Sequence, residues 1–279
     1  IIDAKGRIIA VLAGQPSDPS YAASADAAYA AFQAEAVAAK FPCSQYLHRR
    51  GGSFPALNVG MFHGKGTRAP IALDNGIYNG LLVRLLANPH INRMVVYASS
   101  AFTLWAPKVY QHYHERDTKL CQYYPHLLRN FPKSVFSCAA FKLGPDIWMF
   151  WHRDATNVPF DWCAVQALGR FDPTKGGHLV LWDLELIIEF PAGATILLPS
   201  ATIVHSNIPV DVRNREERAS FTQYTPGGLL RFVDNEFRTE TEFANEDPEG
   251  YLKKCEEKES RWERSLRMLS TVDELFEPE

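Results

Sequence analysis

The sequence predicts an α+β fold in which a mainly β core, of the sandwich or jelly-roll type, is flanked by helices. Short segments rich in aromatic and β-branched residues follow one another after residue 134, with turn-forming residues between them at 169–177 and 191–193. Helical patterns precede and follow this region. Because the short segments are not separated by helices, the pattern argues against a repeated βαβ arrangement.

The region 1–134 is expected to be helical and looped, and to pack on the core. Apolar residues at helical spacing predict helices at 21–40, 77–87 and 101–124, with one short strand at 93–97. The segment that follows residue 40 contains Gly51-Gly52 and Gly64-Lys65-Gly66, and it is predicted to be a loop.

The core, 135–238, is predicted to contain strands at 146–154, 163–168, 178–181, 184–190, 195–198 and 219–224. Trp148, Trp151 and Trp182 belong to these strands or their ends and are assigned to core packing. The extension 239–279 is charged and helical, and its expected buried stripe is Leu252, Cys255, Trp262, Leu266 and Leu269. We expect the three regions to form one structural unit.

The 279-residue chain is 46% hydrophobic and carries a net charge of −3, without an apolar run that could span a bilayer or a secretory leader. We therefore expect a soluble intracellular protein. Its five cysteines are odd in number and far apart, which predicts reduced thiols instead of a disulfide framework or a zinc ribbon.

One stretch of the N-terminal region is purely cationic. Residues 36–73 lack Asp and Glu but include Lys40, Arg49, Arg50, Lys65 and Arg68. Arg and Lys make most protein contacts to phosphate, so this stretch is compatible with a phosphate-facing surface. A solvated loop accounts for the same charges equally well.

A metal site is indicated by three residues. Side chains alternate faces along a strand, so His152 and Asp154 point the same way while Arg153 points the opposite way. Together with His205, which follows the strand at 195–198, they make a 2-His-1-carboxylate set that suits Fe(II) and leaves coordination positions open. A strand-end His hydrogen-bonded to a neighbouring carboxylate is the alternative for the His-x-Asp pair alone.

A second set of polar residues lies on the last predicted strand. Alternation places Arg218, Ser220, Thr222 and Tyr224 on one face, which is costly to bury unless it binds something. The Arg218 guanidinium would grip a carboxylate through two parallel hydrogen bonds, and Ser220 could donate a third. His178 is a further candidate for holding a co-substrate. The alternatives are a strand face open to water and a purely structural histidine.

These motifs resemble those of the TET/JBP branch of 2-oxoglutarate oxygenases, which oxidise methyl groups on DNA bases, and the fungal members most closely. The resemblance covers roughly 50–238. Its most specific parts are His152-Arg153-Asp154-Ala155-Thr156-Asn157, Gly176-Gly177-His178-Leu179-Val180-Leu181-Trp182-Asp183, His205-Ser206-Asn207 and the segment 218–224.

The resemblance implies a double-stranded β-helix core in which His152, Asp154 and His205 bind Fe(II). It implies that Arg218 and Ser220, with His178, hold 2-oxoglutarate, and that O₂ is the second co-substrate. Asn157 falls where the family hydrogen-bonds the flipped base, and Tyr224 where the family stacks a ring on it. The phosphates would then meet Arg49, Arg50, Lys65 or Arg68.

Two departures limit what the resemblance implies about substrate. Pro226 stands where better-known members have a base-contacting His, and the cysteine-rich zinc module of the animal enzymes is missing. The expected partner is methylated DNA with its target base flipped out, without a membrane or an obligate protein partner, and the expected location is nuclear. 5-Methylcytosine is the first choice of substrate, with N6-methyladenine and thymine left open. A protein or small-molecule hydroxylase and a non-catalytic jelly-roll binding module remain the alternatives.

Overall fold

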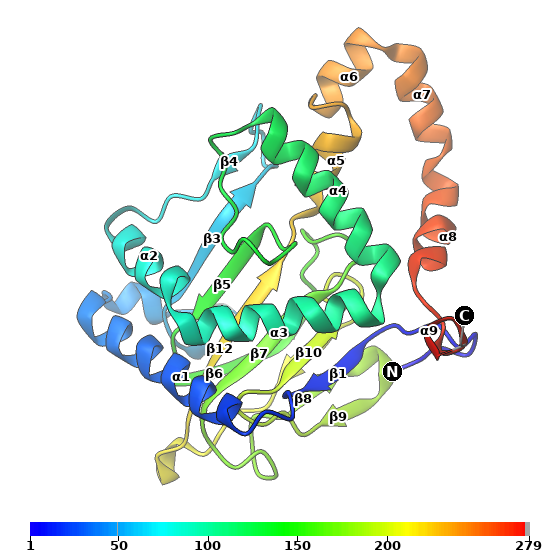
Figure 1. Cartoon of the computed structure of the whole chain (residues 1–279). Coiled ribbons are helices and arrows are strands. Elements are labelled where there is room, and N and C mark those ends of the chain that lie inside the picture. The colour runs from blue at the N-terminus through cyan, green and yellow to red at the C-terminus, as the bar shows by residue number, and fades with distance from the viewer. Residues whose placement is uncertain (49, 277–279) are drawn as a thin grey trace.

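A computed structural model describes residues 1–48 and 50–276 and shows one curled sheet with two arms (Figure 1). The first arm runs in the order β1 (Val11–Gly14), β10 (Thr195–Leu198), β7 (Cys163–Arg170), β12 (Glu217–Tyr224), β5 (Cys138–Lys142), β3 (Ala56–Phe62) and β4 (Ile71–Ala72). The second runs in the order β2 (Gly51–Ser53), β6 (Asp146–His152), β11 (His205–Asn207), β8 (Leu179–Leu181) and β9 (Leu186–Ile188).

The two arms meet where Arg218 of β12 pairs in parallel with Asp146 of β6. Elsewhere β12 pairs antiparallel with β7 and β5, and β6 pairs antiparallel with β11 and β2. The junction therefore places the start of β12 against the start of β6, the strand that leads to His152. The mainly β core with helices around it confirms the predicted α+β, jelly-roll fold class.

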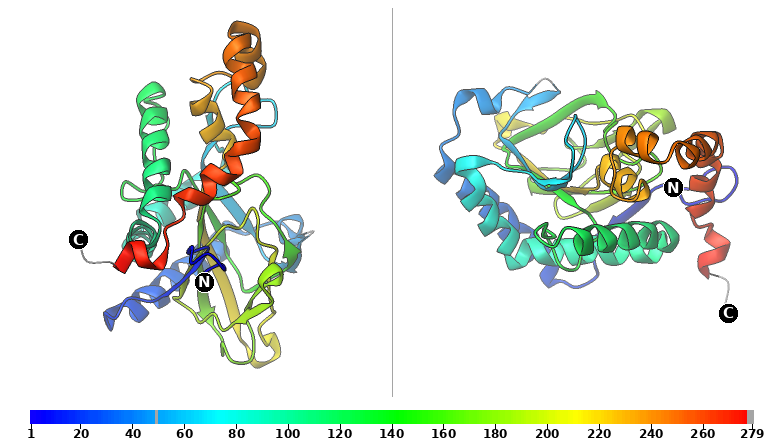
Figure 2. Two further views of the ribbon diagram at one scale, coloured as in Figure 1. Left: turned by 90° about the vertical axis from the view of Figure 1, so that its right-hand side faces the viewer. Right: turned by 90° about the horizontal axis from the view of Figure 1, so that it is seen from above.

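Helices cover the outer face of the first arm, as the view from above shows (Figure 2). They are α1 (Ser20–Ala39), α2 (Asn79–Ala87), α3 (Pro89–Trp105) and α4 (Pro107–Tyr123). The odd-numbered residues of β12 face them: Phe221 belongs to the same buried cluster as Phe32 and Phe141, whose ring centroids lie 5.6 Å apart. The even-numbered residues of β12 consequently face the inside of the curl.

The predicted helices at 21–40 and 77–87 are confirmed with small shifts of their ends, but the predicted strand at 93–97 is wrong. Those residues lie in α3, which begins where the Asn88 side chain accepts hydrogen bonds from the backbone N–H groups of His90 and Ile91, with Pro89 in the first turn. The predicted helix at 101–124 is two helices, α3 and α4, separated at Ala106 because Pro107 starts a new one.

The segment predicted as a loop after residue 40 contains three strands, β2, β3 and β4, which corrects that prediction. Residues 56–60 of β3 pair with 138–142 of β5, and Gly51 of β2 pairs with Met149 of β6. Gly60 has a φ of +127° and a Cβ there would lie 2.1 Å from the Ser137 carbonyl oxygen. Gly51 and Gly52, which suggested a loop, are likewise sites of close backbone approach within the sheet, whereas Gly64 and Gly66 do lie in a loop.

The chain ends in α5 (Gly227–Asp234), α6 (Glu240–Glu246), α7 (Pro248–Glu256), α8 (Lys258–Met268) and α9 (Val272–Phe276). Helices α6 to α8 project away from the sheet as an arm that returns to the body near the N-terminus (Figure 1), where Ile8 donates a backbone hydrogen bond to Ser270. The helical prediction is confirmed but its buried stripe is wrong: Leu252 is 62% and Trp262 51% exposed, while Leu269 is buried. A projecting arm has little surface to pack on. In the described part of the chain, none of the helices has the length and hydropathy needed to cross a bilayer.

Candidate active site

His152, Asp154 and His205 meet at the end of strands β6 and β11. His205 is the register partner of His152 in this antiparallel pair, so their side chains share one face of the sheet. The two imidazole rings lie 4.3 Å apart, and one potential ligand atom from each of the three residues falls within 4.8 Å of the others. This is a preformed three-ligand site facing into the curl.

Backbone carbonyls fix the tautomer of both histidines. The Nδ1 atom of His152 lies 2.8 Å from the Phe150 carbonyl oxygen, and that of His205 lies 2.9 Å from the Ile203 carbonyl oxygen. Since a carbonyl can only accept, each Nδ1 carries the proton and each Nε2 keeps a free lone pair. Both Nε2 atoms lie 3.9 Å from an Asp154 carboxylate oxygen. The free lone pairs and the carboxylate therefore point at a common centre.

The protonation states also suit a metal. Burial, with the second histidine beside it, lowers the pKa of His152 to about 4, and burial lowers the pKa of His205. Burial alone would raise the pKa of Asp154, but the charges of His205, Lys142 and His152 outweigh it and lower that pKa. Neutral imidazoles and an ionised carboxylate at neutral pH are the forms that bind a divalent cation. Two nitrogens and one carboxylate fit Fe(II).

Arg218 lies deep inside the curl with an incomplete set of hydrogen bonds. Its side chain is 3% exposed; Nη1 donates to the Ile147 carbonyl oxygen at 3.3 Å, while Nε has no partner among the described residues. Burial lowers the pKa of this guanidinium to about 10. A buried cation with an unused donor is costly unless an anion completes it, so the pocket is built for a carboxylate or a similar group.

The structure adds Lys142, which sequence reasoning missed. Lys142 of β5 is the register partner of Ser220, so it shares the face of Arg218. Its ammonium group contacts the Met149 sulfur at 3.2 Å and lies within electrostatic range of Asp154 and Arg218. Burial lowers its pKa. A lysine that ends an otherwise apolar segment, Cys138-Ala139-Ala140-Phe141, was the available signal.

Ser220 and Thr222 lie on the face of β12 that carries Arg218. Ser220 and Thr222 are buried on β12, and the Thr222 hydroxyl has no partner among the described residues. His178 precedes β8, and its buried Nδ1 atom is also without one. The unused Thr222 hydroxyl therefore lies on the same strand face as the unused Arg218 Nε, which matches a pocket that closes around a polar ligand.

Asn157 and Tyr224 lie at the rim of this region, and the structure constrains both. The Asn157 amide nitrogen lies 3.2 Å from the Cys163 sulfur and 3.3 Å from the Ser200 hydroxyl oxygen. The Tyr224 hydroxyl donates to the Asn58 side-chain oxygen at 3.3 Å, and burial raises its pKa. Both side chains are therefore held by the protein.

The four residues expected to contact phosphate fall in different places. Arg49 lies outside the described residues. Arg50 forms an ion pair with Asp154 at 3.3 Å, which puts it at the metal centre instead of on a separate basic surface. Lys65 and Arg68 are exposed. Phosphate contacts by Lys65 and Arg68 stay a prediction.

The assignment of the tryptophans to core packing is wrong for two of them. Trp151 is 70% and Trp182 54% exposed, because the second arm of the sheet has one face in solvent and Trp151 alternates with His152 along β6. The Trp182 indole nitrogen donates to the Ser206 hydroxyl at 3.0 Å. Trp151 therefore lies on the face of β6 opposite to His152, in contact with solvent.

No protein-family model matches this sequence, and neither does a curated protein. Among solved structures, the chain is similar to NgTET1 in complex with 5mC DNA, with a TM-score of 0.53 and 11% identity over 82% of this chain and 76% of that one. It is also similar to an oxidoreductase of the 2OG-Fe(II) oxygenase family from Burkholderia pseudomallei, with a TM-score of 0.39 and 18% identity over 71% and 76%. At these identities the first likeness shows a shared fold. The curled sheet and the position of the three-ligand site within it are together those of a double-stranded β-helix.

Proposed function

We propose that this protein is an Fe(II)- and 2-oxoglutarate-dependent dioxygenase that oxidises the methyl group of a modified DNA base, most favourably 5-methylcytosine. The observation that carries the dioxygenase part is the pairing of a His-Asp-His site with two cations on neighbouring strands, the buried Arg218 and the half-buried Lys142. A dicarboxylate that binds the metal at one end would meet the guanidinium at the other. Arg218 and Ser220, with His178, would hold 2-oxoglutarate, and Lys142 would add a second positive charge.

Bound iron, 2-oxoglutarate and O₂ would supply the oxidising chemistry that converts a C–H bond into C–OH. The residues of the chain bind and orient. The two Nε2 lone pairs and the Asp154 carboxylate would hold the metal, while the carbonyls of Phe150 and Ile203 keep both rings in place. Arg218 and Lys142 would neutralise the charge of the dicarboxylate.

The choice of a DNA base rests on the motif resemblance and on the fold shared with NgTET1, whose structure contains 5mC DNA. The rim residues support it. With its amide nitrogen engaged by Cys163 and Ser200, Asn157 has its Oδ1 atom left to accept a hydrogen bond. An acceptor fits the exocyclic amino group of cytosine or adenine and disfavours thymine, which presents an oxygen there. We therefore place the protein with the TET/JBP enzymes, nearest their fungal members, and in the nucleus.

Mass spectrometry of nucleosides tests this proposal. Incubation with iron, 2-oxoglutarate and duplexes that carry 5-methylcytosine, N6-methyladenine or unmodified bases should yield an oxidised base from the first and succinate in proportion. Asn157→Ala should impair base oxidation, while turnover of 2-oxoglutarate that is not coupled to base oxidation continues. Succinate formed with peptides but not with DNA would instead identify a protein hydroxylase. Absence of 2-oxoglutarate turnover with every substrate would leave a binding module.

A further inference from the structure

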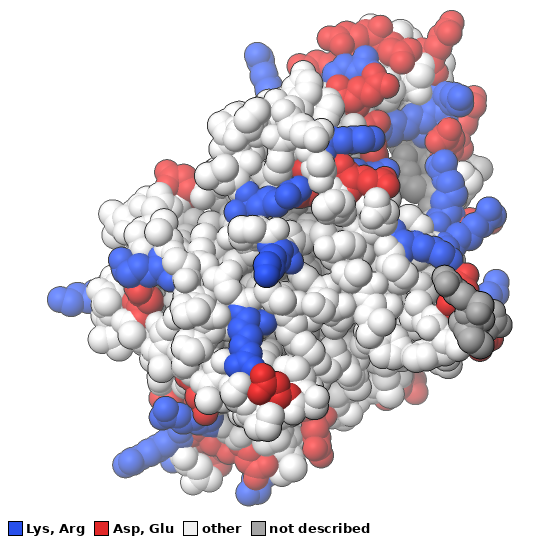
Figure 3. Space-filling model, in the orientation of Figure 1, with Lys and Arg blue, Asp and Glu red and all other residues white. Residues whose placement is uncertain are grey.

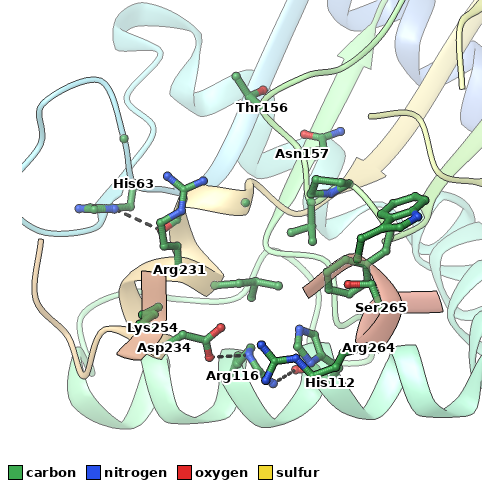
Figure 4. Close-up of a pocket in the computed structure, with 18 of the residues that line it drawn as sticks. His63, His112, Arg116, Thr156, Asn157, Arg231, Asp234, Lys254, Arg264 and Ser265 are labelled. Carbon is green, nitrogen blue, oxygen red and sulfur yellow. Dashed lines mark hydrogen bonds and ion pairs between the residues drawn. The ribbon is translucent and has the colours of Figure 1, made fainter. Parts of the chain in front are cut away.

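A second cavity, of about 1080 Å³, lies between the body of the protein and the C-terminal arm (Figure 4). Helix α4, the loop 155–160, helix α5 and helices α7 and α8 line it. The three metal-ligand candidates are not among its lining residues, but the loop begins immediately after Asp154. The volume is that of a pocket for a ligand or a short polymer segment, and is too small for a duplex.

The cavity is positively charged although the whole chain is slightly acidic. Six of its described lining residues are Lys or Arg and two, Asp234 and Glu257, are acidic, an excess of four positive charges. Arg116 pairs with Asp234 at 2.8 Å and Arg264 with Glu257 at 3.2 Å. Both carboxylates are thereby engaged.

Three of the remaining cations are available to an anion. Lys65, Arg231 and Lys253 are exposed and form no ion pair with a carboxylate among the described residues. Figure 4 shows Arg231 rising from α5 toward the side of the cavity on which Thr156 and Asn157 lie. On the molecular face of Figure 3, Lys and Arg gather beside Asp and Glu over the C-terminal helices, whereas the surface over α1 to α3 is mostly uncharged.

An aromatic surface lies among these charges. Trp262 of α8 lines the cavity and is 51% exposed, so its indole ring is accessible to a ligand in the cavity. Phe62 and Phe160 line other parts of the wall. Cations interleaved with aromatic rings are the pattern by which proteins hold single-stranded nucleic acid: phosphates meet the cations and bases stack on the rings.

The cavity is connected to the candidate active site through the backbone. Gly227, at the start of α5, donates a hydrogen bond to the Thr156 carbonyl oxygen at 2.9 Å, and Asn157 pairs with Pro226. The loop that carries Asp154 at one end is therefore fixed to the helix that carries Arg231. A strand held in the cavity would leave it beside Asn157 and the metal centre.

We propose that this cavity binds a single-stranded stretch of nucleic acid next to the target nucleotide, with phosphates at Lys65, Arg231 and Lys253 and a base stacked on Trp262. The inference rests on the proposed function and extends it: it names the surface that holds the substrate strand. An acidic peptide could pair with the same cations, but it would have no base to stack on the exposed indole.

Fluorescence anisotropy of a labelled oligothymidine on the full chain tests the phosphate contacts. The double variant Arg231→Gln, Lys253→Gln should raise the Kd about 25-fold at 0.1 M salt and reduce the slope of log K against log salt by about 1.4, since each phosphate contact contributes about 0.7 for single strands. The matched control, Arg213→Gln with Arg215→Gln, changes two exposed arginines in and after the turn Val212–Asn214, far from the arm. An equal loss of oligothymidine affinity in the cavity variant and the control, or no loss in either, would overturn the inference. Should the double variant fail to fold, Lys65→Gln removes one exposed cation and carries the same test.

Two further variants separate nucleic acid from an acidic peptide. Trp262→Leu should weaken oligothymidine binding about tenfold, and Trp262→Phe should restore most of it, because a phenyl ring still stacks. Polyglutamate of equal charge should bind more weakly than oligothymidine and should be indifferent to both changes. Tighter binding of polyglutamate would show that the cavity takes an acidic protein segment instead.

The outcomes distinguish this inference from the proposed function. If methylated DNA is oxidised but the cavity variants bind it normally, the strand lies elsewhere and the proposed function stands. If the native protein oxidises peptides and does not bind oligothymidine, both proposals fail together.

Discussion

The candidate active site and the arm cavity both present cations, but they do so in opposite environments. Arg218 is buried with an unused donor inside a rigid sheet, whereas Lys65, Arg231 and Lys253 extend into solvent from a loop and two helices. A buried cation that lacks an anion destabilises the protein until its ligand arrives, and it selects that ligand by shape. An exposed cation costs almost nothing and acts by long-range attraction that salt screens. The difference teaches that the first site is suited to specificity and the second to affinity for a polyanion.

The largest expected effect is at the candidate metal ligands, where any substitution should abolish both iron binding and activity. His152→Ala or Asp154→Ala removes one of three ligands, so iron content and product should both fall to background. His114→Ala, on the exposed surface of α4, is the matched control and should leave both unchanged. Metal analysis measures the iron content and a succinate assay measures turnover. Retention of iron by the His152 variant would contradict the proposed metal site.

The second prediction compares the packing of the helices that cover the sheet with that of the projecting C-terminal arm. Phe102 is 0% exposed and lies against Phe136 and Trp162, with ring centroids 5.4 and 5.7 Å away. Phe102→Ala should lower the free energy of unfolding by about 3–5 kcal/mol. Leu252→Ala, in the arm, should change it by less than about 0.5 kcal/mol. Urea unfolding measures both, and a large loss at Leu252 would mean that the arm packs more tightly than its exposure indicates.

The third prediction gives Lys142 opposite effects on binding and stability. Lys142→Met should weaken 2-oxoglutarate binding about 100-fold, as for removal of one partner of a buried charge pair. The same change should raise the stability of the ligand-free protein by about 1 kcal/mol, because the desolvation of the ammonium group and its repulsion by Arg218 and Arg50 outweigh its attraction to Asp154.

Titration calorimetry of the anaerobic, iron-loaded protein and thermal unfolding without ligand provide the two readouts. Lys175→Met, on an exposed loop, is the control and should alter neither. A lysine with a purely structural role would lower stability when removed, which is the reverse sign.

The smallest effect concerns Asp161, which follows the loop 155–160 between the candidate active site and the arm cavity. The carboxyl group is buried, and burial, which outweighs the opposing effects of the Tyr113 hydroxyl and the Arg116 charge, raises the pKa of Asp161 well above its usual value. A folded-state pKa above the unfolded one means that this group favours folding at low pH and opposes it increasingly as pH rises above about 4. Asp161→Asn should therefore stabilise the protein by about 1–2 kcal/mol at pH 7.5 and have little effect at pH 4. Urea unfolding at both pH values tests the sign.

The sequence by itself determined what depends on local pattern and donor chemistry. Period-2 alternation identified the face of Arg218 and Ser220, and the His-x-Asp pair with the later His205 identified three candidate metal ligands, because strand geometry fixes which side chains point together. Local pattern also predicted the Ala-rich helix α1 and most strands after residue 134, but it missed β5 and β11.

Only the tertiary structure decided what depends on neighbours distant in the chain. Lys142 lies near Arg218 because β5 pairs with β12, and Arg50 lies near Asp154 because β2 pairs with β6. Trp262 is exposed because the arm that carries it projects from the body. Burial and the pairing of charges are properties of the space around a side chain, and a single sequence does not specify which distant segment fills that space.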